Sequence, residues 1–141
     1  MALTVNAPRI AYRVAGDGGS PVVMIMGFAM RGVVWRPQVE ALSARHRVVT
    51  FDNRGVGGSD PMGGLITMRE MASDVLRLVD ELEIPRFHLV GVSMGGMIAQ
   101  EVALARPGGL QSLTLIATHA GGPSAVLPRR SGIESFLGAT L

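Results

Sequence analysis

The sequence predicts an α/β fold: a mostly parallel sheet with helices on both faces. Two observations favour it. Short continuous apolar runs, typical of strands covered on both sides, alternate along the 141 residues with segments of helical periodicity. Glycine and proline residues separate these segments as turns and form no repeat. Strands joined by helices in this order pair in parallel, because a right-handed crossover returns the chain to the same sheet.

The first half of the chain predicts three strands and one helix. Residues 9–16 alternate apolar and polar side chains, as a half-buried strand does. Residues 21–27 and 47–55 begin with continuous apolar runs and predict buried strands. Residues 34–46, between these two strands, have the spacing of an amphipathic helix.

A second helix is predicted at residues 67–84. Thr67 and Glu70 have the spacing of a capping box, in which each side chain binds the other residue's backbone N–H. An apolar stripe follows at helical spacing, and Pro85 ends the helix because proline cannot continue the hydrogen-bond ladder.

The rest of the chain predicts a strand at 87–92, a helix at 94–105 and a fourth buried strand at 112–118. We expect one domain over the whole chain. Its core would be residues 1–120, and residues 121–141 would form a tail that is exchanged or packs on a partner.

Composition argues against several partners. The chain has no lysine, its arginines are scattered and its net charge is only +2, so no basic stripe for nucleic acid is visible. It has no cysteine, which excludes disulfides and thiolate zinc sites. No run approaches the roughly 18 apolar residues needed for a membrane span, and the start does not resemble a signal peptide. We therefore expect a cytoplasmic protein without nucleic-acid or membrane partners.

One serine stands in a G-x-S-x-G pattern, Gly91-Val92-Ser93-Met94-Gly95, directly after a predicted strand and before a predicted helix. This context predicts a sharp turn that strains the serine and requires small residues beside it. The serine hydroxyl would then stand at a helix N-terminus, where the dipole and free N–H groups favour developing negative charge. The pattern predicts that Ser93 is a nucleophile.

Acyl transfer also needs donors for an oxyanion. The backbone N–H of Met94, the residue after the nucleophile, is one candidate, and the N–H of Phe28, after the strand at 21–27, is the other. In the alternative interpretation, Ser93 merely occupies a tight turn and Phe28 belongs to the core.

In order and spacing, four segments resemble the first part of the α/β-hydrolase family, which includes esterases, enol-lactone hydrolases and cofactor-free haloperoxidases. The segments read MGFAM…W, VVTFDNRGVGGSD, HLVGVSMGGMIAQEVA and SLTLIATHAGGP, between Tyr12 and Pro123. The resemblance implies a serine-esterase site with no metal or other cofactor. It also implies a structural DNRG loop, with Asp52 and Arg54 bracing the turns.

The resemblance covers a truncated core, without the family's cap domain or last strands, where its acid and histidine follow the serine. His46 and His88 lie at the amino ends of their strands, away from Ser93. His119 follows the strand at 112–118 and is a candidate base, within the chain or from a second copy. The alternative is a loop histidine without a role. No acid is assigned, although Asp52 and Asp60 are expected on loops at the same edge of the sheet as Ser93.

The strand at 112–118 would be an exposed apolar edge, which invites pairing. We expect a homodimer or higher oligomer that covers this edge. The predicted function is a small, promiscuous hydrolase of small-molecule esters or lactones, with an incomplete or rebuilt triad. Two alternatives stay open: a non-catalytic fragment or binding module, and peracid chemistry at the same serine.

Overall fold

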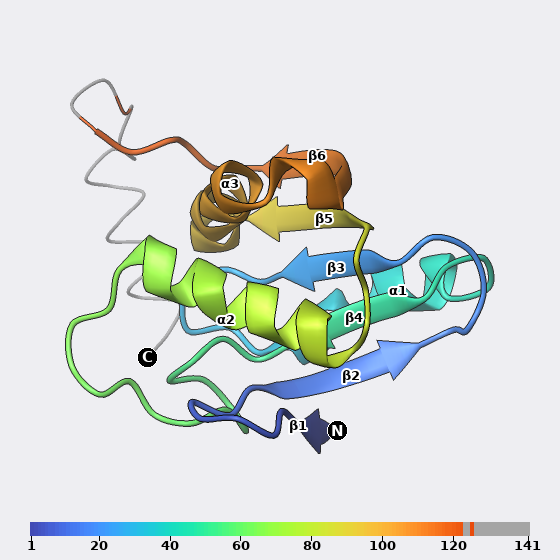
Figure 1. Ribbon diagram of the computed structural model, residues 1–141, viewed down its shortest axis with the longest axis horizontal. Helices are drawn as coiled ribbons and strands as arrows, with labels where there is room; N and C mark the ends of the chain where they lie inside the picture. Colours follow the sequence, from blue (N-terminus) through green and yellow to red (C-terminus); the bar gives the residue numbers. More distant parts are fainter. Residues whose placement is uncertain (123–124, 126–141) are drawn as a thin grey trace.

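Six strands form one sheet in the order β1-β2-β4-β3-β5-β6 in the computed structural model, which describes residues 1–122 and 125 (Figure 1). The strands are β1 (Ala2–Leu3), β2 (Ala11–Ala15), β3 (Val22–Ile25), β4 (Val48–Phe51), β5 (Phe87–Val92) and β6 (Leu110–Ile116). Neighbours from β4 to β6 pair in parallel, whereas β2 pairs antiparallel with both β1 and β4. The predicted α/β fold with a mostly parallel sheet is confirmed; β1 was not predicted.

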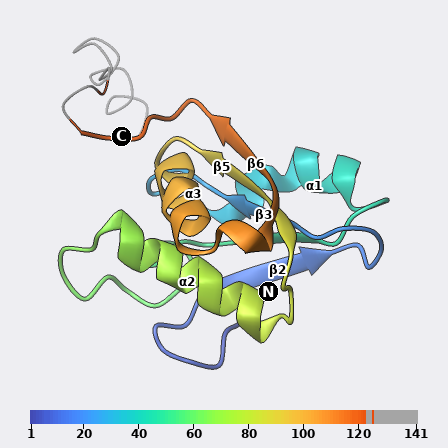
Figure 2. The same ribbon diagram turned by 45° about the horizontal axis from the view of Figure 1, so that its top comes forward.

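Helices cover both faces of this sheet, as predicted (Figure 2). They are η1 (Gly32–Trp35), α1 (Arg36–Leu42), α2 (Met68–Glu81), α3 (Met94–Ala105) and η2 (Pro107–Gly109). Trp35 and Val39 pack with β3 and β4 side chains on one face. The larger core lies on the other face, between the sheet, α2 and α3. The helix predicted at 34–46 is thus a 3-10 turn followed by a short helix with Pro37 in its first turn.

The start of α2 has the predicted capping box. The Glu70 N–H donates to Thr67 Oγ1 at 3.2 Å, and the Thr67 N–H donates to Glu70 Oε2 at 2.7 Å. The apolar stripe is buried; it consists of Met71, Val75, Leu78 and Val79. Burying such side chains contributes about 1.5–3 kcal/mol each, so packing rather than helix propensity holds α2 on the sheet.

The strand predicted at 112–118 is β6. Its expected place at an exposed edge of the sheet is confirmed, and only the expectation that its apolar run is buried is wrong. Strand β6 begins two residues earlier, and its residues from Gln111 onward are exposed. The physical reason is its place in the sheet: β6 is the last strand in the order and pairs only with β5 among the described residues. Leu113, Leu115 and Ile116 are 38–42% exposed along it. Most of the predicted tail, 121–141, lies outside the described residues.

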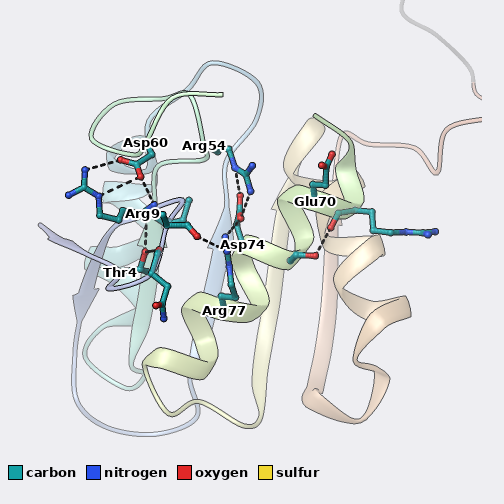
Figure 3. A network of polar contacts seen from close by, with 12 residues as sticks. Thr4, Arg9, Arg54, Asp60, Glu70, Asp74 and Arg77 are labelled. Carbon is teal, nitrogen blue, oxygen red and sulfur yellow. Dashed lines mark hydrogen bonds and ion pairs between the residues drawn. The ribbon is translucent and has the colours of Figure 1, made fainter. Parts of the chain in front are cut away.

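Ion pairs fasten the loops at the carboxyl edge of the sheet to α2 (Figure 3). Asp74, 4% exposed, accepts hydrogen bonds from Arg54 Nη2 at 2.6 Å and from Arg77. Hydrogen bonds from the Arg9 backbone and side chain hold the pKa of Asp60 below its ordinary value. These contacts fix the glycine-rich loop that follows β4.

Candidate active site

Ser93 lies between the carboxyl end of β5 and the first turn of α3, as predicted. Its backbone has φ 54° and ψ −122°. These angles match the first central residue of a type II′ turn, a position that glycine dominates. Holding another residue there costs about 1–3 kcal/mol, which the surrounding structure must outweigh. Such strain concentrates at functional sites, and here it presents the Ser93 side chain to solvent.

The glycines around Ser93 are required by close backbone contacts. A Cβ on Gly91 would lie 2.7 Å from the Gly95 carbonyl carbon, and one on Gly95 would lie 2.7 Å from the Met26 oxygen. A Cβ on Gly96 would overlap the Thr118 side chain. Larger residues would therefore push α3 away from the strands that it contacts.

Strand β6 holds the strained turn from the other side. The Ser93 N–H donates to the Ile116 oxygen at 2.9 Å, and Thr118 Oγ1 donates to the Ser93 carbonyl at 2.7 Å. Both bonds use only the backbone of Ser93. In the part of the chain that the structure describes, Ser93 Oγ has no hydrogen-bond partner.

The two backbone N–H groups proposed from the sequence as donors belong to segments next to Ser93. Met94 opens α3, and Phe28 lies in the loop after β3, where Ala29 also has a positive φ of 57°. This loop adjoins the nucleophile, since a Cβ on Gly27 would lie 3.9 Å from Ser93 Oγ. Within residues 1–122 and 125, neither the Phe28 nor the Met94 N–H has a backbone acceptor. The Phe28 side chain is 59% exposed, so the interpretation of Phe28 as core is wrong.

A cavity of about 450 Å³ opens in front of Ser93. It is lined by Met26, Gly27, Phe28, Met30, Val34, Trp35, Gln38, Val92, Ser93 and Ile116. None of these residues is charged. A larger hollow of about 600 Å³ lies over β2 and β4 beside α1, but no serine, histidine or carboxylate lines it. The cavity at Ser93 is therefore the one that joins a nucleophile to space for an apolar ligand.

The family is decided by comparison with known proteins. The sequence matches the family described as alpha/beta hydrolase fold over residues 20–139. The chain belongs to the α/β-hydrolase family. The mostly parallel sheet and the strand–serine–helix turn are the features of this family that the sequence resemblance implied.

Individual relatives carry several hydrolase names. The chain is 38% identical over 105 residues to a carbamate hydrolase, RutD, of Azorhizobium caulinodans, a match that covers 74% of this chain and 39% of that protein. It is 43% identical over 112 residues to a non-heme bromoperoxidase, BpoC, of Mycobacterium tuberculosis, covering 78% and 42%. The solved enol-lactonase from Burkholderia xenovorans is 31% identical with a TM-score of 0.82, covering 99% of this chain and 58% of the lactonase. The chain spans about half the length, or less, of these curated relatives.

Two of the three histidines lie away from the α/β-hydrolase site. His88 opens β5, and its ring nitrogens contact the hydroxyls of Ser20 at 3.1 Å and Ser112 at 2.7 Å. His46 precedes β4, and its Nδ1 lies 3.0 Å from the Ser20 carbonyl oxygen. Both belong to the amino edge of the sheet, opposite Ser93, as expected.

His119 follows β6 at the carboxyl edge of the sheet. Its Nδ1 accepts the Gly121 N–H at 2.9 Å, so a neutral ring carries its proton on Nε2. Gln100 Nε2 donates to the His119 carbonyl at 3.1 Å. No hydrogen bond joins His119 to Ser93 in the described residues. To accept the serine proton, the ring would have to release the Gly121 N–H.

The DNRG loop braces the turns, in line with the sequence interpretation. Asp52 is 4% exposed and accepts the N–H of Gly32 at 2.8 Å and of Gly58 at 3.0 Å. Sequence reasoning missed two neighbours: Asn53, which binds the Met26 carbonyl, and Thr118, which binds the Ser93 carbonyl. Each lies two residues past the end of an observed strand but inside the segment predicted as that strand. The polar residue that follows each apolar run is the signal that could have found them.

Within residues 1–122 and 125, no group of three or more His, Cys, Asp or Glu side chains could hold a metal ion. No helix in the same residues is long and apolar enough to cross a membrane.

Proposed function

We propose that the chain is a small serine hydrolase that cleaves carboxylic esters or lactones through Ser93. One observation carries the proposal: a serine held at φ 54° lines an uncharged cavity, and the nearby N–H groups of Phe28 and Met94 have no backbone acceptor among the described residues. A strained serine between two free donors serves acyl transfer, because the donors can bind an oxygen that becomes negative during the reaction.

The proposed reaction follows from this arrangement. Ser93 Oγ attacks the carbonyl carbon of the ester while its proton passes to a base, and the carbonyl oxygen becomes an oxyanion that accepts from both N–H groups. When the carbonyl re-forms, the alcohol leaves with the proton from the base, and Ser93 is acylated. Water then attacks in the same way, and the acid leaves. A lactone follows the same steps and gives one hydroxy acid.

Broad acceptance of small, neutral substrates belongs to this proposal. The cavity is lined by apolar residues and one amide, Gln38, so no charged group selects a particular acid or alcohol. The carbamate hydrolase and enol-lactonase names of the relatives support the chemical class. A cytoplasmic location is also proposed, and cell fractionation would test it.

Hydrolysis of p-nitrophenyl acetate tests the nucleophile. We expect turnover in the wild type and its loss in Ser93→Ala. Ser73→Ala is the matched control, because Ser73 is an exposed hydroxyl on α2 that bonds only the Arg69 carbonyl, at 3.0 Å. Equal rates in the wild type and Ser93→Ala would refute the proposal and favour a non-catalytic module.

His119 is the proposed base, supplied within the chain or by a second copy. Its place after β6 supports the proposal, and release of the Gly121 N–H would free its Nδ1. We expect His119→Ala to lose ester turnover while His46→Ala keeps it. If the base comes from a second copy, mixing Ser93→Ala with His119→Ala restores part of the activity. Unchanged turnover in His119→Ala would remove the residue from the mechanism.

We also propose that β6 pairs with a second copy in a homodimer or higher oligomer. Its apolar side chains are exposed, and its outer edge has no strand beside it among the described residues. Exposed edges of this kind pair readily with other chains. Light scattering at micromolar concentration tests the proposal, and a soluble monomer would contradict it.

Peracid chemistry is the second candidate function, favoured by the similarity to the bromoperoxidase BpoC. A carboxylic acid would acylate Ser93 with release of water, and hydrogen peroxide would then take the acyl group as a peracid. Acetate- and peroxide-dependent bromination that Ser93→Ala loses would support it.

A further inference from the structure

Asn53 connects the loop after β4 to the loop that carries Phe28. It lies two residues past the end of β4, is 3% exposed, and its Nδ2 donates to the Met26 carbonyl oxygen at 3.0 Å. Strands β4 and β3 are parallel neighbours, so the two loops leave the sheet side by side. Outside the regular elements of the described residues, the backbone offers this carbonyl no other donor.

The same carbonyl lies against the turn that carries the nucleophile. A Cβ on Gly95 would lie 2.7 Å from the Met26 oxygen and would overlap the Ile25 oxygen. The Met26 carbonyl is therefore confined between the Asn53 amide and the first turn of α3. Ser93 and Met94 belong to that turn. The Met26 carbonyl therefore contacts the turn of the nucleophile and also begins the loop that carries Phe28.

Glycine makes this anchor necessary. The peptide plane that contains the Met26 carbonyl is separated from the one that contains the Phe28 N–H by Gly27 alone. Glycine restrains its own dihedral angles least of all residues. Ala29, the residue after Phe28, is held at φ 57°, a conformation that persists only where its surroundings enforce it. The Gly27 carbonyl, which shares a peptide plane with the Phe28 N–H, accepts the Met30 N–H only at a long 3.4 Å. The direction of the Phe28 N–H therefore depends also on what fixes the plane before it.

We propose that Asn53 is a positioning residue for the oxyanion donor at Phe28. It acts through the Met26 carbonyl and contacts no substrate. The inference rests on the proposed hydrolase function for its effect on rate. Its structural part, that Asn53 holds the Phe28 N–H in one orientation, does not need turnover and is measured separately.

The kinetic test compares Asn53→Leu, which keeps the bulk and removes the donor, with Thr4→Val as a control. Thr4 is a comparably buried hydroxyl, 5% exposed, that accepts the Ile10 N–H at 2.8 Å three strands away from β3. Losing an oxyanion donor costs about 100- to 1,000-fold, so misplacing one should lower kcat for p-nitrophenyl acetate about 10- to 100-fold. We expect the KM of Asn53→Leu to change little. We expect Thr4→Val to keep the wild-type kcat even if its melting temperature falls as much as that of Asn53→Leu.

The structural test follows the backbone amide of Phe28 by NMR. In the wild type we expect one sharp signal, and in Asn53→Leu a signal broadened by exchange on the microsecond to millisecond scale. Thr4→Val should leave it sharp. If Asn53→Leu fails to fold, Asn53→Ala removes the same donor with less bulk.

The outcomes separate the two proposals. An unchanged Phe28 signal in the Asn53 variants, unchanged kcat, or an equal loss of kcat in Thr4→Val would overturn the positioning role. Equal hydrolysis by the wild type and Ser93→Ala would overturn the proposed function instead. In that case the NMR comparison alone decides whether Asn53 orients the loop.

Discussion

Replacing Ser93 with glycine should stabilise the protein relative to Ser93→Ala, although both variants lack the nucleophile. At φ 54° and ψ −122°, alanine keeps the strain of the native turn and glycine does not. Relief of that strain is worth about 1–3 kcal/mol. The greater freedom of glycine in the unfolded chain takes back about 0.4–1 kcal/mol. The expected net difference is about 1.3 kcal/mol in favour of glycine, between extremes of about 0 and 2.6 kcal/mol.

Urea unfolding followed by tryptophan fluorescence measures this difference. The chain has a single tryptophan, Trp35, which is 5% exposed in the native state and reports on the core beside the site. Free energies are compared by linear extrapolation at unchanged m-values. The matched control is Ser73 in the middle of α2, where the sign should reverse. There glycine should be about 0.5–1 kcal/mol less stable than alanine, as in any helix interior.

If Ser93→Gly is no more stable than Ser93→Ala, the turn is not strained in the folded protein. Local strain would then not be what presents the Ser93 side chain, whatever the activity of the wild type.

Three further predictions concern the frame of the site. Gly95→Ala should lower the free energy of unfolding in urea by about 1–3 kcal/mol and reduce ester turnover, since its methyl group meets the backbone of β3. In the control Gly63→Ala, the methyl group meets nothing within 4 Å, so stability and turnover should not change. Asp74→Asn should cost about 3 kcal/mol, because two arginines lose their buried carboxylate; a loss below 0.5 kcal/mol would place the network among surface pairs. A hydrogen bond from Arg106 lowers the pKa of Asp80 from 3.8, so this pair stabilises the fold fully above about pH 4 and less as pH falls through the lower folded value. Acid titration of Asp80→Asn beside the wild type should therefore show a stability difference that shrinks below pH 3.8.

Local signals in the sequence located the elements that carry the nucleophile. The capping box of α2, the strand at 87–92 and the helix at 94–105 follow from side-chain periodicity and from caps, which act between residues a few positions apart. The turn at Ser93 is also local, because its glycines are needed within four residues of the serine.

Contacts across the sheet could not be predicted from periodicity and caps. The Asn53 amide binds the Met26 carbonyl, 27 residues away, only because β4 and β3 are neighbours. The antiparallel pairing of β2 was also not predictable, because the alternating pattern of a strand does not give its direction. Exposure of β6 depends on which elements cover it, not on its apolar composition. The hydrogen bond from Gly121 to the His119 ring is likewise a property of the folded loop.

By itself, then, the sequence determined that this protein alternates strands and helices and places a strained serine at one strand-to-helix turn, because periodicity and backbone sterics act within a few residues. Only the tertiary structure decided which side chain binds the Met26 carbonyl, which residues line the cavity beside Ser93, and which nitrogen of His119 already accepts a hydrogen bond. These depend on the order of strands in the sheet, which brings together segments that are distant along the chain.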